Sequence, residues 1–174
     1  MSRSASMTSE AQGPEADQEA VGRKILLDQL TGRARSRSEL ADKLRGKLVP
    51  DGVAEQLLDR FEEVGLVDDG EFARAWVTDR QRSKGLAPRA LAQELRRKGI
   101  DDETARAALA EVTEDDQEAA ARVLVRRRLR AVGGLDQLTA TRRLTGLLAR
   151  KGYSPGLAFR VVRDELGADL SEES

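Results

Sequence analysis

The sequence contains an internal repeat with a period of about fifty residues. Three stretches can be aligned with one another: SRSELADKLRGKLVPDGVAEQLL from Ser36, APRALAQELRRKGIDDETARAAL from Ala87 and ATRRLTGLLARKGYSPGLAFRVV from Ala140. Each stretch carries two leucines four positions apart, namely Leu40 and Leu44, Leu91 and Leu95, and Leu144 and Leu148. Residues at this spacing share one face of a helix, so the repeat is typical of stacked helical units rather than of one globular bundle.

Each repeat has the residue pattern of three helices. The first helix is apolar at helical spacing, through Ile25, Leu26 and Leu30, through Phe72 and Trp76, and through Leu124, Val125 and Leu129. The second helix carries the paired leucines. The third carries Leu57, Leu58 and Phe61, then Ala105 and Leu109, then Phe159, Val162 and Leu166. These periodicities predict an all-α fold, with Trp76 in the core rather than on a base-stacking surface.

The turn between the second and third helices differs among the repeats. Repeats 2 and 3 have KGI and KGY at this point, where Gly99 and Gly152 fit a helix end in the left-handed conformation. Repeat 1 has Leu48 at the glycine position and Gly46 two residues earlier, so we expect a different turn there.

Polar residues mark the predicted helix starts. Ser36 and Glu39 have the spacing of a capping box. Asp101 precedes DETARAAL as a cap, and Ser154 precedes a proline at the first helical position. Helix boundaries predicted in this way carry an uncertainty of about two to four residues.

The adjacent carboxylates Asp68 and Asp69 raise the question of catalysis. Asp68 lies one residue before an expected helix start and three before Glu71, which is capping spacing, and Asp69 suits the positive end of the helix dipole. Catalytic carboxylates need a partner and an environment that separates their pKa values, and the sequence shows neither. We therefore interpret the pair as a helix start.

The residue types argue against catalysis and metal binding. The chain has no histidine and no cysteine, which removes the usual near-neutral base, thiol nucleophile and zinc ligands. The stretch GLLARKGYS lacks the order of a phosphate-binding loop. We expect no enzymatic activity, no catalytic residues, no cofactor and no metal site.

The sequence shows neither a membrane-spanning segment nor a secretory signal, and this bears on the location of the protein in the cell. No run approaches the roughly twenty apolar residues that span a bilayer, and the first twenty residues have no apolar signal core. Rich in Ser, Glu, Gln and Ala, residues 1–21 are expected to form a disordered acidic tail. A cytoplasmic protein without membrane contact is predicted.

Charge is strongly segregated along the chain, although the formal net charge is −1. The segment Asp101–Glu118 has eight acidic residues and one arginine, whereas Ala121–Arg163 has eleven Lys and Arg and one aspartate. Such runs are often solvated faces, and the basic run can pair with the acidic one beside it. The contrast favours a basic surface that meets polyanions or an acidic protein.

Two basic sets are candidate binding surfaces for DNA or an acidic protein. On a helix through ARVLVRRRLRAV, Arg122, Arg126 and Arg130 share an outward face with Arg127 beside them. The next helix extends this set through Arg142, Arg143, Arg150 and Lys151. The second set, from the middle repeat, is Arg74, Arg80, Arg82, Lys84, Arg89, Arg96, Arg97 and Lys98. Arginine predominates, and its planar group binds phosphate or carboxylate bidentately. The sequence does not tell which set faces DNA.

The stretch GLVDDGEFARAWV resembles the central signature of the RecX regulatory proteins. The D-D-x-x-F-A core of that family corresponds here to Asp68, Asp69, Phe72 and Ala73, followed by Trp76. RSRSELADKL and APRALAQELRRKGI are similar to the second-helix segments of its first two units. The resemblance covers about residues 23–166 and is most specific in the middle repeat.

The resemblance implies an elongated, curved array of three tandem three-helix repeats at residues 22–67, 68–113 and 114–168, with a C-terminal tail at 169–174. It further implies a monomer that binds the RecA recombinase filament on single-stranded DNA. Inhibition of ATPase, strand-exchange and co-protease activities would follow, and with it regulation of DNA repair, recombination and the SOS response. Two alternatives remain open: a stand-alone, sequence-nonspecific nucleic-acid-binding protein, and a helical scaffold whose charges only maintain solubility.

Overall fold

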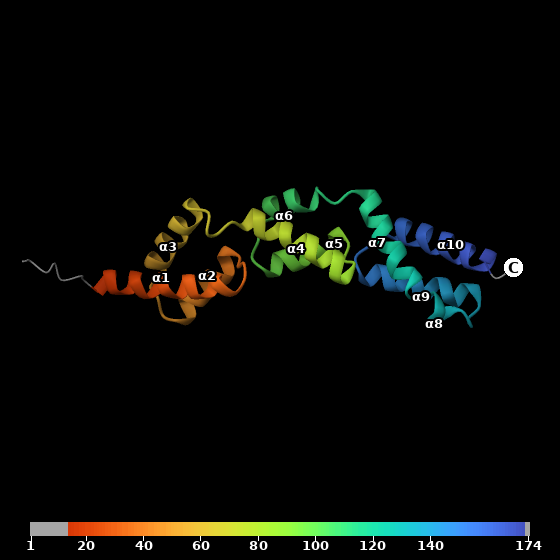
Figure 1. Cartoon of the computed structure of the whole chain (residues 1–174), viewed down its shortest axis with the longest axis horizontal. Coiled ribbons are helices and arrows are strands. Elements are labelled where there is room, and N and C mark those ends of the chain that lie inside the picture. Colours follow the sequence, from red (N-terminus) through yellow and green to blue (C-terminus); the bar gives the residue numbers. More distant parts are fainter. Residues whose placement is uncertain (1–13, 173–174) are drawn as a thin grey trace, which may run out of the picture. The chain divides into compact units, whose positions relative to one another are not determined.

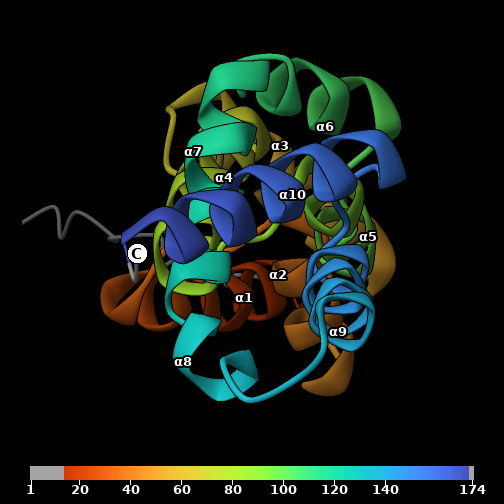
Figure 2. The same cartoon turned by 90° about the vertical axis from the view of Figure 1, so that its right-hand side faces the viewer.

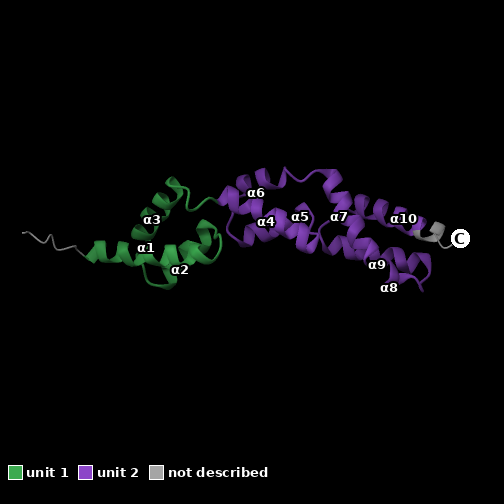
Figure 3. Ribbon diagram, viewed as in Figure 1, with its two compact units in different colours: residues 1–68 green, residues 69–174 purple. Residues whose placement is uncertain are grey.

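A computed structural model describes residues 14–172, and Figure 1 shows this part of the chain as a series of helices. In chain order they are α1 (Pro14–Gly32), α2 (Arg37–Gly46), α3 (Asp51–Glu63), α4 (Asp69–Lys84), α5 (Pro88–Arg97), α6 (Asp102–Leu109), α7 (Glu114–Arg126), α8 (Leu129–Val132), α9 (Gln137–Arg150) and α10 (Pro155–Glu172). No strand occurs among these described residues, so the all-α prediction is confirmed. The chain divides into two compact units, Met1–Asp68 and Asp69–Ser174, coloured separately in Figure 3.

The first unit contains repeat 1, in which α1, α2 and α3 pack around one apolar cluster. Leu40 and Leu44 of α2 are fully buried in this cluster, together with Leu26 of α1 and Leu57 of α3. Gly22 allows α1 to approach α3 closely, because a Cβ atom there would lie 2.5 Å from Leu57 Cδ1. The paired leucines thus mark the buried face, as the periodicity predicted.

Helix α1 begins earlier than the sequence predicted. It starts at Pro14, so residues 14–21 are helical and are not part of a disordered tail. Glu19 helps to hold this segment, because its carboxylate accepts a hydrogen bond from Arg60 of α3 at 2.6 Å. Residues 1–13, the remainder of the predicted tail, lie outside the described residues.

The second unit contains repeat 2 (α4–α6) and repeat 3 (α7–α10), each with its own apolar cluster. The clusters contain the remaining paired leucines, Leu91 and Leu95 in repeat 2 and Leu144 and Leu148 in repeat 3. In repeat 3, α10 packs against both α7 and α9, as Figure 2 shows. Helix α10 continues to Glu172, so residues 169–172 of the predicted C-terminal tail are helical.

Hydrogen bonds join repeats 2 and 3 within the second unit. The Tyr153 hydroxyl donates to the carbonyl of Gly85 at 2.8 Å, and the amide of Ala87 donates to the carbonyl of Lys151 at 2.9 Å. Burial raises the pKa of Tyr153 to about 12, because the charged phenolate is disfavoured away from water. The turn that ends α9 is therefore attached to the loop that precedes α5.

The turn between the second and third helices has the same hand in all three repeats. The turn residue has φ = 61° at Leu48, 74° at Gly99 and 93° at Gly152. The next amide bonds in each case to the carbonyl five residues earlier, which is the Schellman pattern. The expectation of a different turn in repeat 1 is wrong, because Leu48 adopts the left-handed conformation with its side chain 86% exposed.

The basic stretch after Ala121 is broken into two helices, contrary to the prediction of one. Helix α7 ends at Arg126, the amide of Arg128 bonds back to Val125 at 2.8 Å, and α8 begins at Leu129. The break lets the chain turn while Val125 and Val132 remain buried in one cluster. Arg130 therefore does not continue the α7 face that carries Arg122 and Arg126.

The helix caps inferred from sequence are present. Ser36 Oγ accepts from the Glu39 amide at 3.2 Å, and the Glu39 carboxylate accepts from the Ser36 amide at 3.2 Å, which completes a capping box. Asp101 accepts from the Thr104 amide at 2.8 Å, and Ser154 caps α10 in the same way. Short-range signals thus set these three helix starts.

Candidate polyanion-binding site

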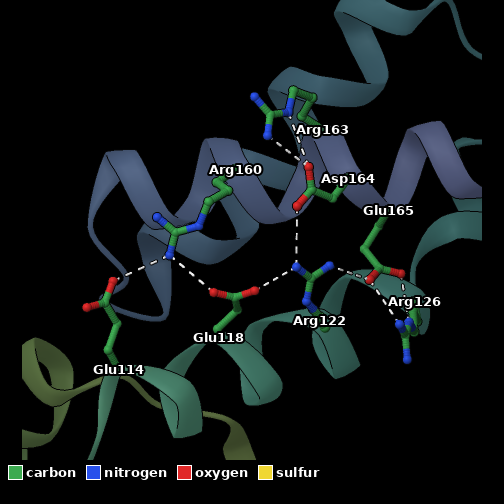
Figure 4. Close-up of polar contacts among 8 residues, drawn as sticks. All are labelled: Glu114, Glu118, Arg122, Arg126, Arg160, Arg163, Asp164 and Glu165. Atoms are coloured by element: carbon green, nitrogen blue, oxygen red, sulfur yellow. Dashed lines mark hydrogen bonds and ion pairs between the residues drawn. The ribbon is translucent and has the colours of Figure 1, made fainter.

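The two arginines of α7 that were expected to face a partner are instead paired inside repeat 3 (Figure 4). Arg126 donates through Nε and Nη2 to the two carboxylate oxygens of Glu165 on α10, at 2.7 and 3.0 Å. Arg122 donates to Glu165 at 2.9 Å, to Glu118 at 2.6 Å and to Asp164 at 3.3 Å. The two arginines are therefore not the unpaired outward face that was expected, although the Arg126 side chain is still 62% exposed. Their role in binding stays a prediction.

Glu165 is the centre of this ion network, with only 5% of its surface exposed. Its hydrogen bonds from Arg126 and then Arg122 outweigh the effect of burial and lower its pKa. Hydrogen bonds to Glu118 and Glu165 raise the pKa of Arg122. Because ionised partners surround each group, the network holds α7 against α10 with charge-assisted hydrogen bonds.

Four other arginines of repeat 3 line an open groove of about 530 Å³. The groove lies between the α7–α8 junction and α9, and we call it the arginine groove, formed by Arg128, Arg142, Arg143 and Arg150. Its remaining wall is apolar, with contributions from Val132, Leu144 and Leu147. All four arginine residues are exposed, so their guanidinium groups are accessible to a ligand.

No carboxylate of the described residues forms an ion pair with these four arginines. Glu114, Glu118, Asp164 and Glu165 of α7 and α10 are instead paired with Arg122, Arg126 and Arg160. Un-neutralised guanidinium groups gathered in one groove are suited to bind an extended anion, since each can grip a phosphate or carboxylate bidentately.

The structure divides the predicted basic set of repeat 3. Arg142, Arg143 and Arg150 come together in the arginine groove, whereas Lys151 and the exposed Arg127 and Arg130 do not line it. Arg128 was not among the predicted site residues and lines the groove. It was missed because a continuous helix places it off the expected face, and only the break after α7 brings it to α9.

A second groove, of about 470 Å³, lies beside the arginine groove on α9 and shares Arg142 with it. We call it the Phe159 groove; it is lined by Arg142, Thr145, Gly146, Ala149, Pro155, Ala158 and Phe159. Phe159 was expected in the core but is 56% exposed. The buried face of α10 runs through Leu157, Val161 and Glu165, and Phe159 lies away from it.

The basic residues of repeat 2 are not assembled into one groove. Arg80 lies over the Trp76 ring at 4.2 Å, and Lys98 lies over the same ring at 4.9 Å. Lys84 and Arg80 are ion-paired with Glu94. Arg74 and Arg82 line a different groove, together with Glu71 and Asp79. Arg96 pairs with Asp102 at 3.6 Å. The last two, Arg89 and Arg97, are exposed.

The central motif of repeat 2 has a structural place. Helix α4 begins at Asp69, directly after Asp68. Phe72 and Ala73 are buried, and Trp76 stacks on Phe72 with ring centroids 5.7 Å apart. The Trp76 indole N–H donates to Glu94 at 2.9 Å. The motif thus joins α4 to α5 through its aromatic pair, and Trp76 is half-buried rather than fully enclosed.

The described residues contain neither a cluster of metal ligands nor a membrane-spanning helix. Within residues 14–172, no group of three or more acidic side chains is placed to hold a metal ion. None of the helices in that range combines the length and the apolar character needed to cross a bilayer. The arginine groove and the Phe159 groove both lie along α9 of the second unit.

The fold and grooves define the class: a helical-repeat protein composed of three-helix domains. Family models for the first, second and third three-helix domains of RecX match residues 23–61, 68–109 and 114–162. The Regulatory protein RecX of Thermobifida fusca is 53% identical over 150 residues, covering 86% of this chain and 81% of its own length. That of Streptomyces lividans is 50% identical over 153 residues, with 88% and 81% covered. The chain belongs to the RecX family.

Solved structures agree on the fold. The crystal structure of RecX from Lactobacillus salivarius superposes with a TM-score of 0.81 at 22% identity, covering 86% of this chain and 97% of that one. A second crystal structure of regulatory protein RecX gives a TM-score of 0.77 at 25% identity, with 86% and 73% covered. These likenesses confirm the arrangement of three-helix repeats.

Proposed function

We propose that the protein is a non-enzymatic regulator that binds the RecA recombinase filament on single-stranded DNA and inhibits its ATPase, strand-exchange and co-protease activities. Its relatives are named regulatory proteins, which supports a role exercised on a partner. The proposal places the protein in the cytoplasm, as a monomer without a cofactor, and in the control of DNA repair, recombination and the SOS response.

The arginine groove is the observation that carries this proposal. A filament on single-stranded DNA is a continuous polyanion, and a binding protein needs cations that its own carboxylates do not neutralise. Repeat 3 satisfies this need, because Glu118, Asp164 and Glu165 pair with Arg122, Arg126 and Arg160, and no described carboxylate pairs with the arginines of the groove. Binding of this kind acts on ATP turnover by favouring one state of the filament over another.

The test is the ATPase rate of the recombinase on single-stranded DNA, titrated with this protein. Inhibition that saturates as the protein covers the filament is the expected result. A parallel binding assay compares recombinase-coated strands with bare strands. A filament regulator prefers the coated strands, whereas equal binding to both, with no effect on ATPase, would favour the alternative of a stand-alone nucleic-acid-binding protein, for which the groove also supplies the cations.

A further inference from the structure

We infer that the arginine groove and the Phe159 groove together form a contact site for single-stranded nucleic acid, with phosphates held by Arg128, Arg142, Arg143 and Arg150 and one base stacked on Phe159. This inference deepens the proposed function and rests on it, because the proposed function supplies single-stranded DNA as the ligand. It assigns the DNA-facing role to repeat 3 rather than to the basic residues of repeat 2.

The first step of the argument is charge. Arginine groove residues lack carboxylate partners among the described residues, whereas the neighbouring Arg122 and Arg126 are ion-paired with Glu165 of α10. Groove cations that remain unpaired keep their full attraction for an anion that enters. A backbone of regularly spaced phosphates matches several guanidinium groups along one groove better than an isolated small anion does.

The second step is the exposed aromatic ring. Phe159 is 56% exposed, although burial of an aromatic ring is favourable and the core of repeat 3 lies directly beneath the neighbouring Ala158. Every base has a flat face that can stack on such a ring, so an exposed phenylalanine beside cationic side chains is suited to single strands. In a duplex the bases are stacked on one another and are not available to it.

The third step is the geometry of α9. Arg142 lines both grooves, so the phosphate-binding and ring-bearing surfaces meet at this residue. Gly146 lies in the wall of the Phe159 groove in the middle of α9, where glycine weakens a helix. A Cβ atom there would meet only the flexible end of Arg150, at 3.4 Å, so the fold itself does not require glycine. Glycine at this position leaves the backbone of α9 open to a close approach by a strand.

The experiment measures binding of the full-length protein to two labelled probes of equal length by fluorescence anisotropy: oligo(dT) and an abasic strand with the same phosphates. Arg143→Glu/Arg150→Glu should weaken the binding of both probes. The slope of the logarithm of the binding constant against the logarithm of the salt concentration should become shallower by about 1 to 1.5, which corresponds to the loss of two phosphate contacts on a single strand. Phe159→Ala should weaken the binding of oligo(dT) at least about fivefold and leave the binding of the abasic strand unchanged.

Matched controls exclude general effects. Lys43→Glu/Lys47→Glu makes the same change in charge at the end of α2, the helix of repeat 1 that corresponds to α9, and should leave binding unchanged. Leu138→Ala removes an exposed apolar side chain from α9, as Phe159→Ala does from α10, and should have no effect on binding. Circular dichroism and urea unfolding check that each variant keeps its fold.

Several outcomes would overturn the inference. They are oligo(dT) binding that Phe159→Ala leaves unchanged or weakens no more than binding of the abasic strand, unchanged binding by the groove variant, and tighter binding of polyglutamate than of oligo(dT) through the same arginines. Inhibition of the recombinase ATPase by the unmodified protein is read separately. If inhibition is present while the groove variant binds strands normally, the inference fails and the proposed function stands. If inhibition is absent while the grooves bind strands as described, the proposed function fails and the inference about the grooves stands.

Discussion

Leu48 and Gly152 occupy equivalent turns in repeats 1 and 3, and both have positive φ values, 61° and 93°. The two positions differ in their surroundings. Leu48 has its side chain in solvent, whereas a Cβ atom at Gly152 would lie 2.7 Å from the amide nitrogen of Ala90 in repeat 2. The same turn conformation therefore leaves room for a side chain in repeat 1 but excludes even a Cβ atom in repeat 3.

Leu48→Gly is expected to stabilise the protein. A non-glycine residue in the left-handed conformation costs about 1–2 kcal/mol, part of which is offset by the greater flexibility of glycine in the unfolded chain. The exposed leucine side chain contributes no burial. We expect a gain of about 0.5–1 kcal/mol in the free energy of unfolding, measured with urea. Leu48→Ala, which keeps the strain, should show no such gain, and a loss in the glycine variant would contradict the explanation.

Gly152→Ala is expected to destabilise the second unit. The methyl group combines an unfavourable φ with a clash against the backbone of Ala90, and the expected loss is about 2 kcal/mol or more. Gly65→Ala is the matched control, because Gly65 has φ = 76° with open space around its Cβ position. Its loss should be smaller, about 1 kcal/mol. Equal losses in thermal or urea unfolding would show that the contact with Ala90 is unimportant.

Tyr153 should make stability fall at high pH. Burial raises its pKa to about 12 from an ordinary value of about 10, so the folded protein holds the proton more tightly than the unfolded chain does. The resulting stabilisation is fully present below pH about 10 and is lost as the pH rises toward about 12. Tyr153→Phe should remove this part of the pH dependence and cost about 1 kcal/mol at neutral pH through the lost bond to Gly85. The chain has one tyrosine, so ultraviolet absorbance follows its ionisation directly.

Glu165→Gln should weaken the packing of α7 on α10. The change removes charge-assisted hydrogen bonds to Arg122 and Arg126, and the expected loss is about 1.5–3 kcal/mol at pH 7. The pKa of Glu165 is lowered in the fold, so its stabilisation is present above its unfolded pKa of about 4.3 and disappears as the pH falls below it.

Urea unfolding of the wild type and the Glu165→Gln variant at several pH values measures this difference. The two stabilities should converge at acidic pH. Asp164→Asn serves as the control, because Asp164 is more exposed and contacts Arg122 at the longer distance of 3.3 Å. A difference that persisted unchanged below the unfolded pKa would show that charge is not the cause.

The repeats and their helix starts were predictable because their signals are local. The paired leucines identify one buried face in each second helix, and all six are nearly or fully buried. Ser36 and Asp101 cap the helices that they precede, since capping depends on residues only three positions away. For the same reason the turn glycines were correctly assigned. Leu48 was not, because the hydrogen bonds of the turn override its backbone preference.

The candidate site was less predictable because it depends on distant residues. Glu118, four residues before Arg122, is a local partner, but Asp164 and Glu165 lie about forty residues further along the chain, on α10, and no local pattern indicates them. One signal was present, since Glu165 follows Leu157 and Val161 at the spacing of a buried helix face, where a carboxylate needs a cationic partner. The break after α7 had no marker, because no glycine or proline interrupts the stretch before Gly133.

The pairing of the α7 arginines with α10 has a consequence for how this chain meets its partner from a distance. With a formal net charge of −1, the molecule as a whole exerts almost no long-range pull on a polyanion. The four free guanidinium groups act only within the ionic screening length, about 8 Å in physiological salt. For the strand-binding site that we propose, encounters would be governed by ordinary diffusion, and selection would take place after contact, through the fit of the strand along α9.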